Sequence, residues 1–232
     1  MLQYKSSFDS LLWVKPTPND DEKILFQRAE KYISRITWIP GLRMVAVVNS
    51  LSMYATHEWS DIDLFVITAK DRMWIVRVLM TLSFSLMWVW RYGEDIAGNF
   101  CLSFFIEEDA MDLSEIAIED DIYLYFWIYY MKPVYVLGDT YERFHTMNWK
   151  LKIDNWKSGK QDRENSLWMF HKIIYYPLLI INSLIRYFWE KKARANYEKK
   201  WKPEGVIITR NILKFHDQDK RKVIRDTLLK GK

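Results

Sequence analysis

Hydrophobic residues in the first half of the chain alternate between helical spacing and short uninterrupted runs. Apolar positions three and four residues apart predict a helix over 21–38 and a longer one over 71–91. Short apolar runs rich in β-branched residues predict buried strands at 43–48 and 61–67, and a third strand is expected at 99–106. Helices that alternate with strands in this way indicate an α/β fold with a small mixed sheet.

The second half of the chain is expected to be mostly helical. Its predicted elements are a short extended piece at 133–138 and helices at 139–147, 161–199 and about 217–229. The polar segment 150–165 is the best candidate boundary between an α/β domain over 1–150 and a helical C-terminal region over 151–232. Because the chain has only seven glycines and no obvious linker, we expect the two parts to pack together.

Charge is unevenly distributed along the chain. The net charge is +4, yet residues 186–232 contain 15 Lys or Arg against six Asp or Glu, and residues 107–121 contain eight acids and no base. A basic segment beside an acidic body is typical of proteins that bind a polyanion such as RNA or anionic lipid. A solvated helical face would give the same composition, so charge alone leaves the partner open.

Neither of the two most apolar segments is long enough to span a bilayer. Residues 78–90 form a run of 13, and 173–185 is interrupted by a proline and an asparagine, whereas a spanning helix needs about 20 apolar residues. The segment 173–192 ends in basic and aromatic residues, so surface attachment stays open. Cys101 is the single cysteine, which excludes an internal disulfide and fits a reducing cytoplasm; we expect it to be a small buried hydrophobe.

Two aspartates are the strongest candidates for chemistry. Asp61 and Asp63 are two residues apart on a predicted strand, so both side chains are expected on one face of the sheet. Neighbouring carboxylates repel one another unless a cation lies between them, and hard oxygen ligands suit Mg²⁺, which also bridges to phosphates. Taken alone, the pair is better explained by a local turn at the start of the strand.

The polar residues that precede this strand favour a metal site over a local turn. Asn49 and Ser50 follow the predicted strand 43–48, and ten residues separate Ser50 from Asp61. Backbone amides and a hydroxyl at such a strand end can hold an anion. A strand, a polar turn, a short helix and an adjacent strand would therefore place a phosphate-binding group beside the metal ligands.

This arrangement resembles the nucleotidyltransferase superfamily to which DNA polymerase beta belongs, in which Gly-Ser, a spacer of similar length and Asp-hydrophobic-Asp or Glu follow one another. The segments 45–52 (VAVVNSLS), 60–68 (SDIDLFVIT) and 72–77 (RMWIVR) are similar to a bacterial family of nucleotidyltransferase-domain proteins, in which Asn-Ser commonly replaces Gly-Ser. Looser similarity extends to 101–106, 147–149 and 215–217. The resemblance implies a nucleotidyltransferase core followed by a helical C-terminal region.

The resemblance also implies a function and a role for each matching residue. Asp61 and Asp63 would be the catalytic pair and hold Mg²⁺, while Asn49 and Ser50 would contact the triphosphate of an NTP such as ATP. The implied reaction transfers a nucleoside monophosphate to an acceptor and releases pyrophosphate. The acceptor can be RNA, a protein side chain or a small molecule.

Basic residues near the motif are weaker candidates. Arg72 and Arg77 either bind the nucleotide or are charges on the surface of a helix, and the resemblance includes both. His57 lies in the spacer, near the expected mouth of the site, but a structural role is the better interpretation.

The sequence departs from the superfamily pattern at two places. Asn49 stands where most relatives have glycine, although Asn tolerates the left-handed backbone that such a turn requires. The superfamily usually has a third carboxylate on the next strand, but the strand 99–106 contains no acid, and Ser103 lies at the equivalent position. Glu107 has the same strand parity as Ser103 and is the acid expected to reach the metal. A catalytically inactive nucleotide-binding or interaction protein on the same fold is therefore the alternative.

Overall fold

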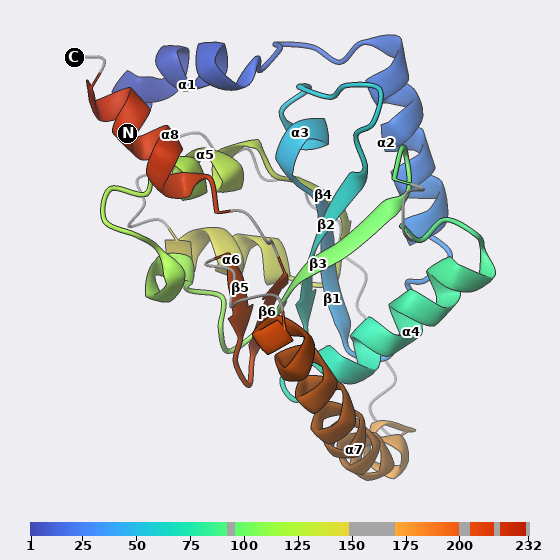
Figure 1. Ribbon diagram of the computed structural model, residues 1–232. Coiled ribbons are helices and arrows are strands. Elements are labelled where there is room, and N and C mark those ends of the chain that lie inside the picture. Colours follow the sequence, from blue (N-terminus) through green and yellow to red (C-terminus); the bar gives the residue numbers. More distant parts are fainter. Residues whose placement is uncertain (92–95, 149–169, 200–204, 216–218, 231–232) are drawn as a thin grey trace.

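The computed structural model describes residues 1–91, 96–148, 170–199, 205–215 and 219–230 (Figure 1). It is an α/β structure, as the sequence predicted, and a mixed six-stranded sheet lies at its centre. In chain order the elements are η1 (Leu2–Tyr4), α1 (Lys5–Leu12), α2 (Asp20–Ile33), β1 (Leu42–Val47), α3 (Asn49–Ser52), β2 (Ile62–Thr68), α4 (Met73–Leu86), β3 (Phe100–Glu107), η2 (Leu113–Ile116), α5 (Ile122–Tyr130), β4 (Lys132–Val136), α6 (Thr140–Asn148), α7 (Phe170–Lys199), β5 (Val206–Ile208), β6 (Ile212–Phe215) and α8 (Arg221–Lys230).

The strand directions bring three chain segments to one edge of the sheet. The strand order is β4-β1-β2-β3-β6-β5, with β1 antiparallel to β2 and β2 parallel to β3. The carboxyl end of β1 therefore meets the amino ends of β2 and β3, as the pairs Val47–Leu64 and Ile62–Phe100 show. We call this the site edge.

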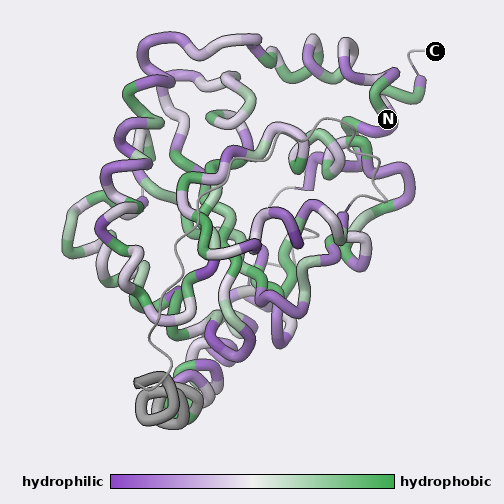
Figure 2. The backbone as a smooth tube through the Cα atoms, turned by 180° about the vertical axis from the view of Figure 1, so that it is seen from behind, coloured by the Kyte–Doolittle hydropathy of each residue, from purple (hydrophilic) through white to green (hydrophobic). Residues whose placement is uncertain are grey.

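Helices cover both faces of the sheet, because the strands alternate apolar residues toward each side. On one face, Val45, Leu64 and Val66 pack against α2 and α4. On the other face, Phe65 and Phe104 pack against α5 and α6. Figure 2 shows the resulting pattern, with hydrophobic segments gathered in the central strands and hydrophilic ones on the outer helices.

A third apolar cluster joins the two ends of the chain next to the site edge. Phe8 of α1 stacks on Phe126 of α5 with ring centroids 4.3 Å apart, and Ile224 and Leu228 of α8 belong to the same cluster. Aromatic pairs at this separation add roughly 0.5–1.5 kcal/mol beyond the burial of their area. Helices α1 and α8 are thereby held together above the sheet (Figure 1).

A buried glutamate fixes the loop between α3 and β2. Glu22 is fully buried, and it forms a capping box with Asn19 at the start of α2. Its carboxylate also accepts hydrogen bonds from the backbone N–H and the hydroxyl of Thr56, at 3.2 and 2.9 Å, and pairs with Lys15 at 3.0 Å. Burial alone would raise the pKa of Glu22, but these hydrogen bonds outweigh it and hold that pKa below its usual value. The spacer before Asp61 is therefore anchored to α2.

The main difference from the sequence prediction is a β-hairpin in the C-terminal part. Strands β5 and β6 lie in a region expected to be mostly helical, and β6 pairs with β3, so this region contributes to the sheet. The two runs, VII and ILKF, are three and four residues long, too short to give a clear period. The predicted boundary at 150–165 lies outside the described residues.

Helix α7 bears on the question of membrane attachment. Among the described residues, no helix combines the length and the apolar character that crossing a bilayer requires. The helix does expose Ile180, Leu184 and Phe188 beside Arg186 and Lys191. Surface attachment through 173–192 stays a prediction.

Candidate metal and nucleotide site

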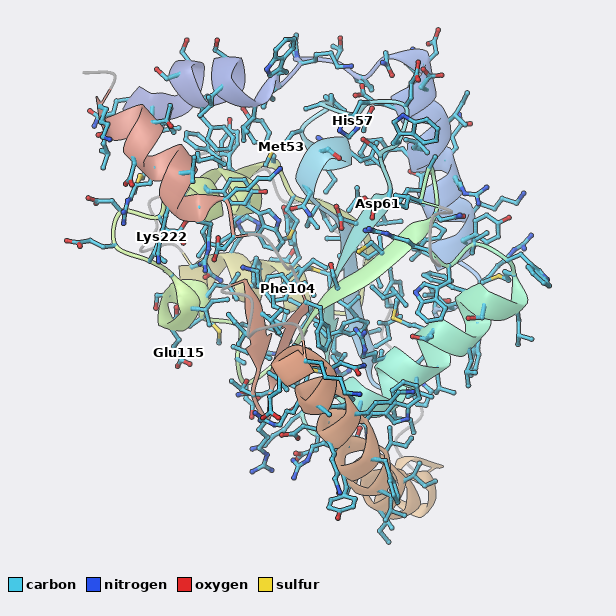
Figure 3. The ribbon with its side chains drawn as sticks, viewed as in Figure 1. Met53, His57, Asp61, Phe104, Glu115 and Lys222 are labelled. Atoms are coloured by element: carbon cyan, nitrogen blue, oxygen red, sulfur yellow. The ribbon has the colours of Figure 1, made fainter. Side chains whose placement is uncertain are left out.

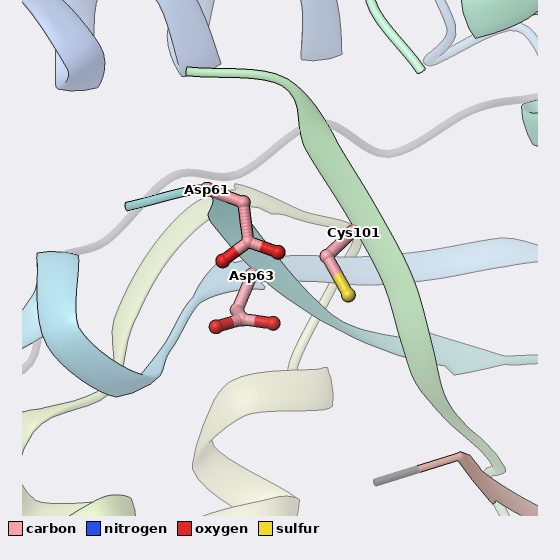
Figure 4. A group of neighbouring side chains, drawn as sticks. All are labelled: Asp61, Asp63 and Cys101. Atoms are coloured by element: carbon pink, nitrogen blue, oxygen red, sulfur yellow. The ribbon is translucent and has the colours of Figure 1, made fainter. Parts of the chain in front are cut away.

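Two aspartates and a cysteine face one another at the site edge. Asp61 immediately precedes β2 and Asp63 lies within it, so strand alternation places both on one face, as expected. Cys101 is the Cα partner of Asp63 on the parallel strand β3. One ligand atom from each of the three side chains lies within 4.8 Å of the other two, and Figure 4 shows them pointing into the same space.

A β-bulge in β3 places Cys101 on the same face of the sheet as Asp63. Asp63 pairs with Cys101, but Phe65 pairs with Phe104, so β3 contains one extra residue at this point. In an unbroken strand Cys101 and Glu107 would share a face, but the bulge leaves Cys101 on the face of Asp63 and Glu107 on the other face, opposite Thr68. Cys101 is only half-buried and faces two carboxylates, so the prediction of a buried hydrophobe is wrong.

Glu107 is at the opposite edge of the sheet. It pairs with Thr68 at the far end of β2, six residues along β3 from Cys101, or roughly 20 Å at the rise of a strand. Its buried carboxylate accepts hydrogen bonds from the backbone N–H groups of Asp71 (2.9 Å) and Met73 (3.2 Å), and burial raises the pKa of Glu107. Glu107 therefore caps the start of α4 and does not join the aspartates.

Arg72 and Arg77 also lie away from the aspartates. Arg72 precedes α4 and is buried against Gly41, so closely that a Cβ atom at position 41 would lie 2.8 Å from the Cβ of Arg72. The guanidinium of Arg77 donates to the carbonyl of Leu102 at 2.5 Å and lies 4.7 Å from the ring centroid of Phe215. Burial lowers the pKa of Arg77 to about 10. Both arginines hold α4 on the sheet. The sequence had suggested either nucleotide binding or a charge on the helix surface, and neither interpretation anticipated this role.

One arginine partly neutralises the aspartate pair. Arg91 Nη1 is 2.7 Å from Asp61 Oδ2, and the same guanidinium also hydrogen-bonds Cys101. Burial, followed by the charge of Asp61, raises the pKa of Asp63 to about 6. Burial and the charge of Asp63 raise the pKa of the Cys101 thiol to about 12, so the thiol keeps its proton at neutral pH. The site edge thus concentrates two carboxylates against one half-exposed guanidinium.

Asn49 links the aspartates to α5. Its backbone has φ +56°, the left-handed conformation that the sequence required of this turn. Asn49 Oδ1 accepts hydrogen bonds from Trp127 Nε1 (2.8 Å) and Tyr123 Oη (3.5 Å), and its side chain lies close enough to Asp63 to lower the pKa of that carboxyl, against the stronger effect of burial. Tyr123 and Trp127 are four residues apart on α5 and therefore share a face. That spacing is the signal by which the pair could have been found among the aromatic residues of 123–130.

A cavity of about 490 Å³ opens beside Asn49. Ser50 and His57 line it, so the expected position of both near a substrate mouth agrees with the cavity. The other walls are mostly apolar, aromatic or basic and include Leu11, Trp13, Met53, Phe104, Tyr123, Trp127, Lys214, Lys220, Arg221 and Ile224, with one acidic residue, Asp219, which pairs with Arg221. Figure 3 labels Met53, His57 and Phe104 among these walls, whereas Glu115 and Lys222 lie on the outside of the molecule.

Basic residues from the C-terminal part face this cavity. Lys214 lies opposite Phe104 in the β3–β6 pair, and paired residues share a face of the sheet. Burial and the charge of Arg221 lower the pKa of Lys214, which has no hydrogen-bond or ion-pair partner among the residues that the structure describes. Arg221, by contrast, is held by Asp121 (3.1 Å) and Asp219 (2.6 Å). The sequence reasoning missed Lys214 because it missed the hairpin; two short β-branched runs separated by three residues are the available signal.

No protein-family model matches the sequence, and no curated protein matches it either. The interpretation therefore depends on the geometry and chemistry of the site. These define an α/β protein with two carboxylates and a thiol beside a basic, aromatic-lined cavity.

Arg91 and a divalent cation would compete for the same Asp61 carboxylate. We expect Arg91→Gln to strengthen the binding of Mn²⁺, measured by calorimetry without nucleotide, by about fivefold, since removing one screened positive charge contributes ~1 kcal/mol. Glu107→Gln is the matched control and should leave Mn²⁺ affinity unchanged. Weaker Mn²⁺ binding by the Arg91 variant, or a loss in the Glu107 variant, would contradict this arrangement.

Proposed function

We propose that the chain is a Mg²⁺-dependent nucleotidyltransferase that transfers a nucleoside monophosphate from an NTP, such as ATP, to an acceptor. One observation carries the proposal. The carboxylates of Asp61 and Asp63 converge next to the Asn49–Ser50 turn, and this turn opens onto a cavity of about 490 Å³. That volume lies within the roughly 300–1,000 Å³ of pockets that enclose small molecules.

The donor set fits a divalent cation. Asp61 and Asp63 supply hard oxygen ligands from one strand face, and in the part of the chain that the structure describes one half-exposed guanidinium, that of Arg91, pairs with them. Asp61 and Asp63 would hold the cation, which would supply positive charge against the nucleotide phosphates and the leaving pyrophosphate.

The cavity walls provide complementary groups for the rest of an NTP. Lys214 and Lys220 offer positive charge for phosphate oxygens, and the Ser50 hydroxyl lies on the same cavity. Trp13, 82% exposed at the cavity, and Tyr123 offer aromatic surface for a base. Each part of the nucleotide would thus meet a group of suitable chemistry.

The residues would act mainly by positioning. Asn49 holds Asp63 through its side chain and is itself held by α5, so the carboxylate keeps its orientation when a ligand enters. In the reaction, the bond from the acceptor oxygen to the α-phosphorus forms as the bond to pyrophosphate breaks, and the acceptor proton passes to water. The basic residues of 186–232 favour a polyanionic acceptor such as RNA, with a protein as the other candidate. A cytoplasmic location belongs to the same proposal.

A second candidate is nucleotide binding without transfer. Among the described residues, the group at the site edge contains two carboxylates and a thiol, with no third carboxylate. A thiol that keeps its proton at neutral pH is a poor substitute for a carboxylate base. This observation favours an interaction or sensor role on the same fold.

Label transfer from α-labelled NTPs separates the two candidates. With Mg²⁺ and either RNA or a cell extract as acceptor, we expect covalent label on an acceptor. Asp61→Asn and Asp63→Asn should lower transfer on the order of 100-fold or more, because each removes charge that holds the cation. Asp226→Asn, an exposed site on α8, is the control and should transfer normally. Binding without transfer would favour the second candidate, and absence of both would reject the proposal.

Lys214 tests whether the cavity holds phosphates. We expect Lys214→Met to weaken NTP binding by about tenfold, the value of one charge-assisted hydrogen bond, and to leave nucleoside binding nearly unchanged. Lys230→Met, at the exposed end of α8, is the control. Calorimetry with NTP and nucleoside measures both effects. An equal loss for the two ligands would mean that Lys214 supports the fold and not the phosphates.

A further inference from the structure

The third member of the site-edge group differs chemically from the other two. Cys101 Sγ is a soft ligand, whereas the carboxylate oxygens of Asp61 and Asp63 are hard. The three atoms come from two neighbouring strands and lie within 4.8 Å of one another (Figure 4). Because ligand atoms around a tetrahedral Zn²⁺ are roughly 3–4 Å apart, given bond lengths of about 2.0 Å to oxygen and 2.3 Å to sulfur, small side-chain rotations would let all three bind one ion.

The backbone fixes the sulfur in this position. The parallel pairing of Asp63 with Cys101 places their side chains on the same face of the sheet, next to each other. The thiol lies beside Asp63 and close enough to the guanidinium of Arg91 to affect the pKa of both groups. Cys101 therefore faces the carboxylates, and any ion bound between the two aspartates would lie against its sulfur.

We propose that this site also takes a thiophilic divalent cation, Zn²⁺ or Co²⁺, with Cys101 Sγ as a direct ligand, and binds it more tightly than it binds Mg²⁺, the ion of the proposed transfer reaction. The inference rests on the proposed function for the place of the ion and adds a second class of ion that this place accepts. Mg²⁺ requires near-octahedral oxygen coordination and gives up its waters reluctantly, so a sulfur neighbour costs it one position. Zn²⁺ accepts cysteine and aspartate together, and coordination releases the thiol proton to water.

The ligand count also fits a working site. Two aspartates and one cysteine make three protein ligands, which leaves the fourth tetrahedral position open for water or for a phosphate oxygen. Arg91, whose side chain is 42% exposed, can turn toward solvent when the ion binds Asp61. The cation can therefore replace the Arg91 guanidinium at Asp61 without any change in the strands.

Cobalt titration of the 232-residue chain tests the proposal, because Cys101 is its only cysteine. A thiolate–cobalt charge-transfer band in the near ultraviolet can then have a single source. After removal of metal with a chelator, we expect one Co²⁺ per chain to produce this band, an equimolar amount of Zn²⁺ to abolish it, and a large excess of Mg²⁺ to leave it in place.

Variants identify the ligands. Cys101→Ser should lose the band entirely, and Asp63→Asn should weaken Co²⁺ binding at least tenfold. Glu107→Gln, at the opposite edge of the sheet, should keep both band and affinity. Circular dichroism confirms that each variant folds. Absence of the band at saturating Co²⁺, its persistence in Cys101→Ser, or its displacement by Mg²⁺ at a concentration equal to that of Co²⁺ would overturn the proposal.

The outcome for the ion is separable from the outcome for the nucleotide. If wild type shows no band but still binds NTP with Mg²⁺, thiophilic selection is rejected and the proposed function stands. If the band forms as described in a protein that binds no nucleotide, the metal assignment stands and the proposed function fails.

Discussion

The position of β2, between an antiparallel and a parallel neighbour, is the constraint on which the rest of the site depends. Its antiparallel pairing with β1 delivers the Asn49 turn to the end at which β2 begins, and its parallel pairing with β3 delivers Cys101 to the same end. If β3 ran the other way, Glu107 would lie at the site edge and Cys101 would lie at the far edge. One choice of strand direction thus decides which side chains meet the aspartates.

The strand arrangement brings together the carboxylates of Asp61 and Asp63, which do not stabilise the fold. A buried carboxylate next to a second one destabilises the folded chain, and the raised pKa of Asp63 reflects its burial first and the charge of Asp61 second. Asn49 and Arg91 offset it in part, through one hydrogen bond and one half-exposed ion pair. A site that stays electrostatically unfavourable without a further cation is typical of a place where a ligand contributes the missing charge.

Much of the fold could be predicted from the sequence because its central strands are uniform apolar runs and its long helices have clear periods. The face shared by Asp61 and Asp63 followed from alternation alone, and the left-handed turn at Asn49 followed from the residue type.

The remainder depended on information that local pattern does not carry. The bulge in β3 shifts the register by one residue, and no feature of the run 100–107 marks where it lies. Arg91 and Lys214 reach the site only through the packing of distant segments. The same holds for Glu107 and Arg77, whose charges looked functional but secure α4 through backbone N–H groups, a carbonyl and an aromatic ring. Arg72, which also looked functional, is buried against Gly41.

The central claim is that the carboxylates at the site edge and the basic cavity form one binding site. The thermodynamic coupling between metal and nucleotide tests it most directly, because two ligands that share a site change each other's affinity by the same factor. Calorimetric titration of NTP with and without saturating Mn²⁺ should show at least tenfold tighter binding with the metal, and Asp63→Asn should abolish the difference. Equal NTP affinity with and without Mn²⁺ in the unaltered protein would contradict the account.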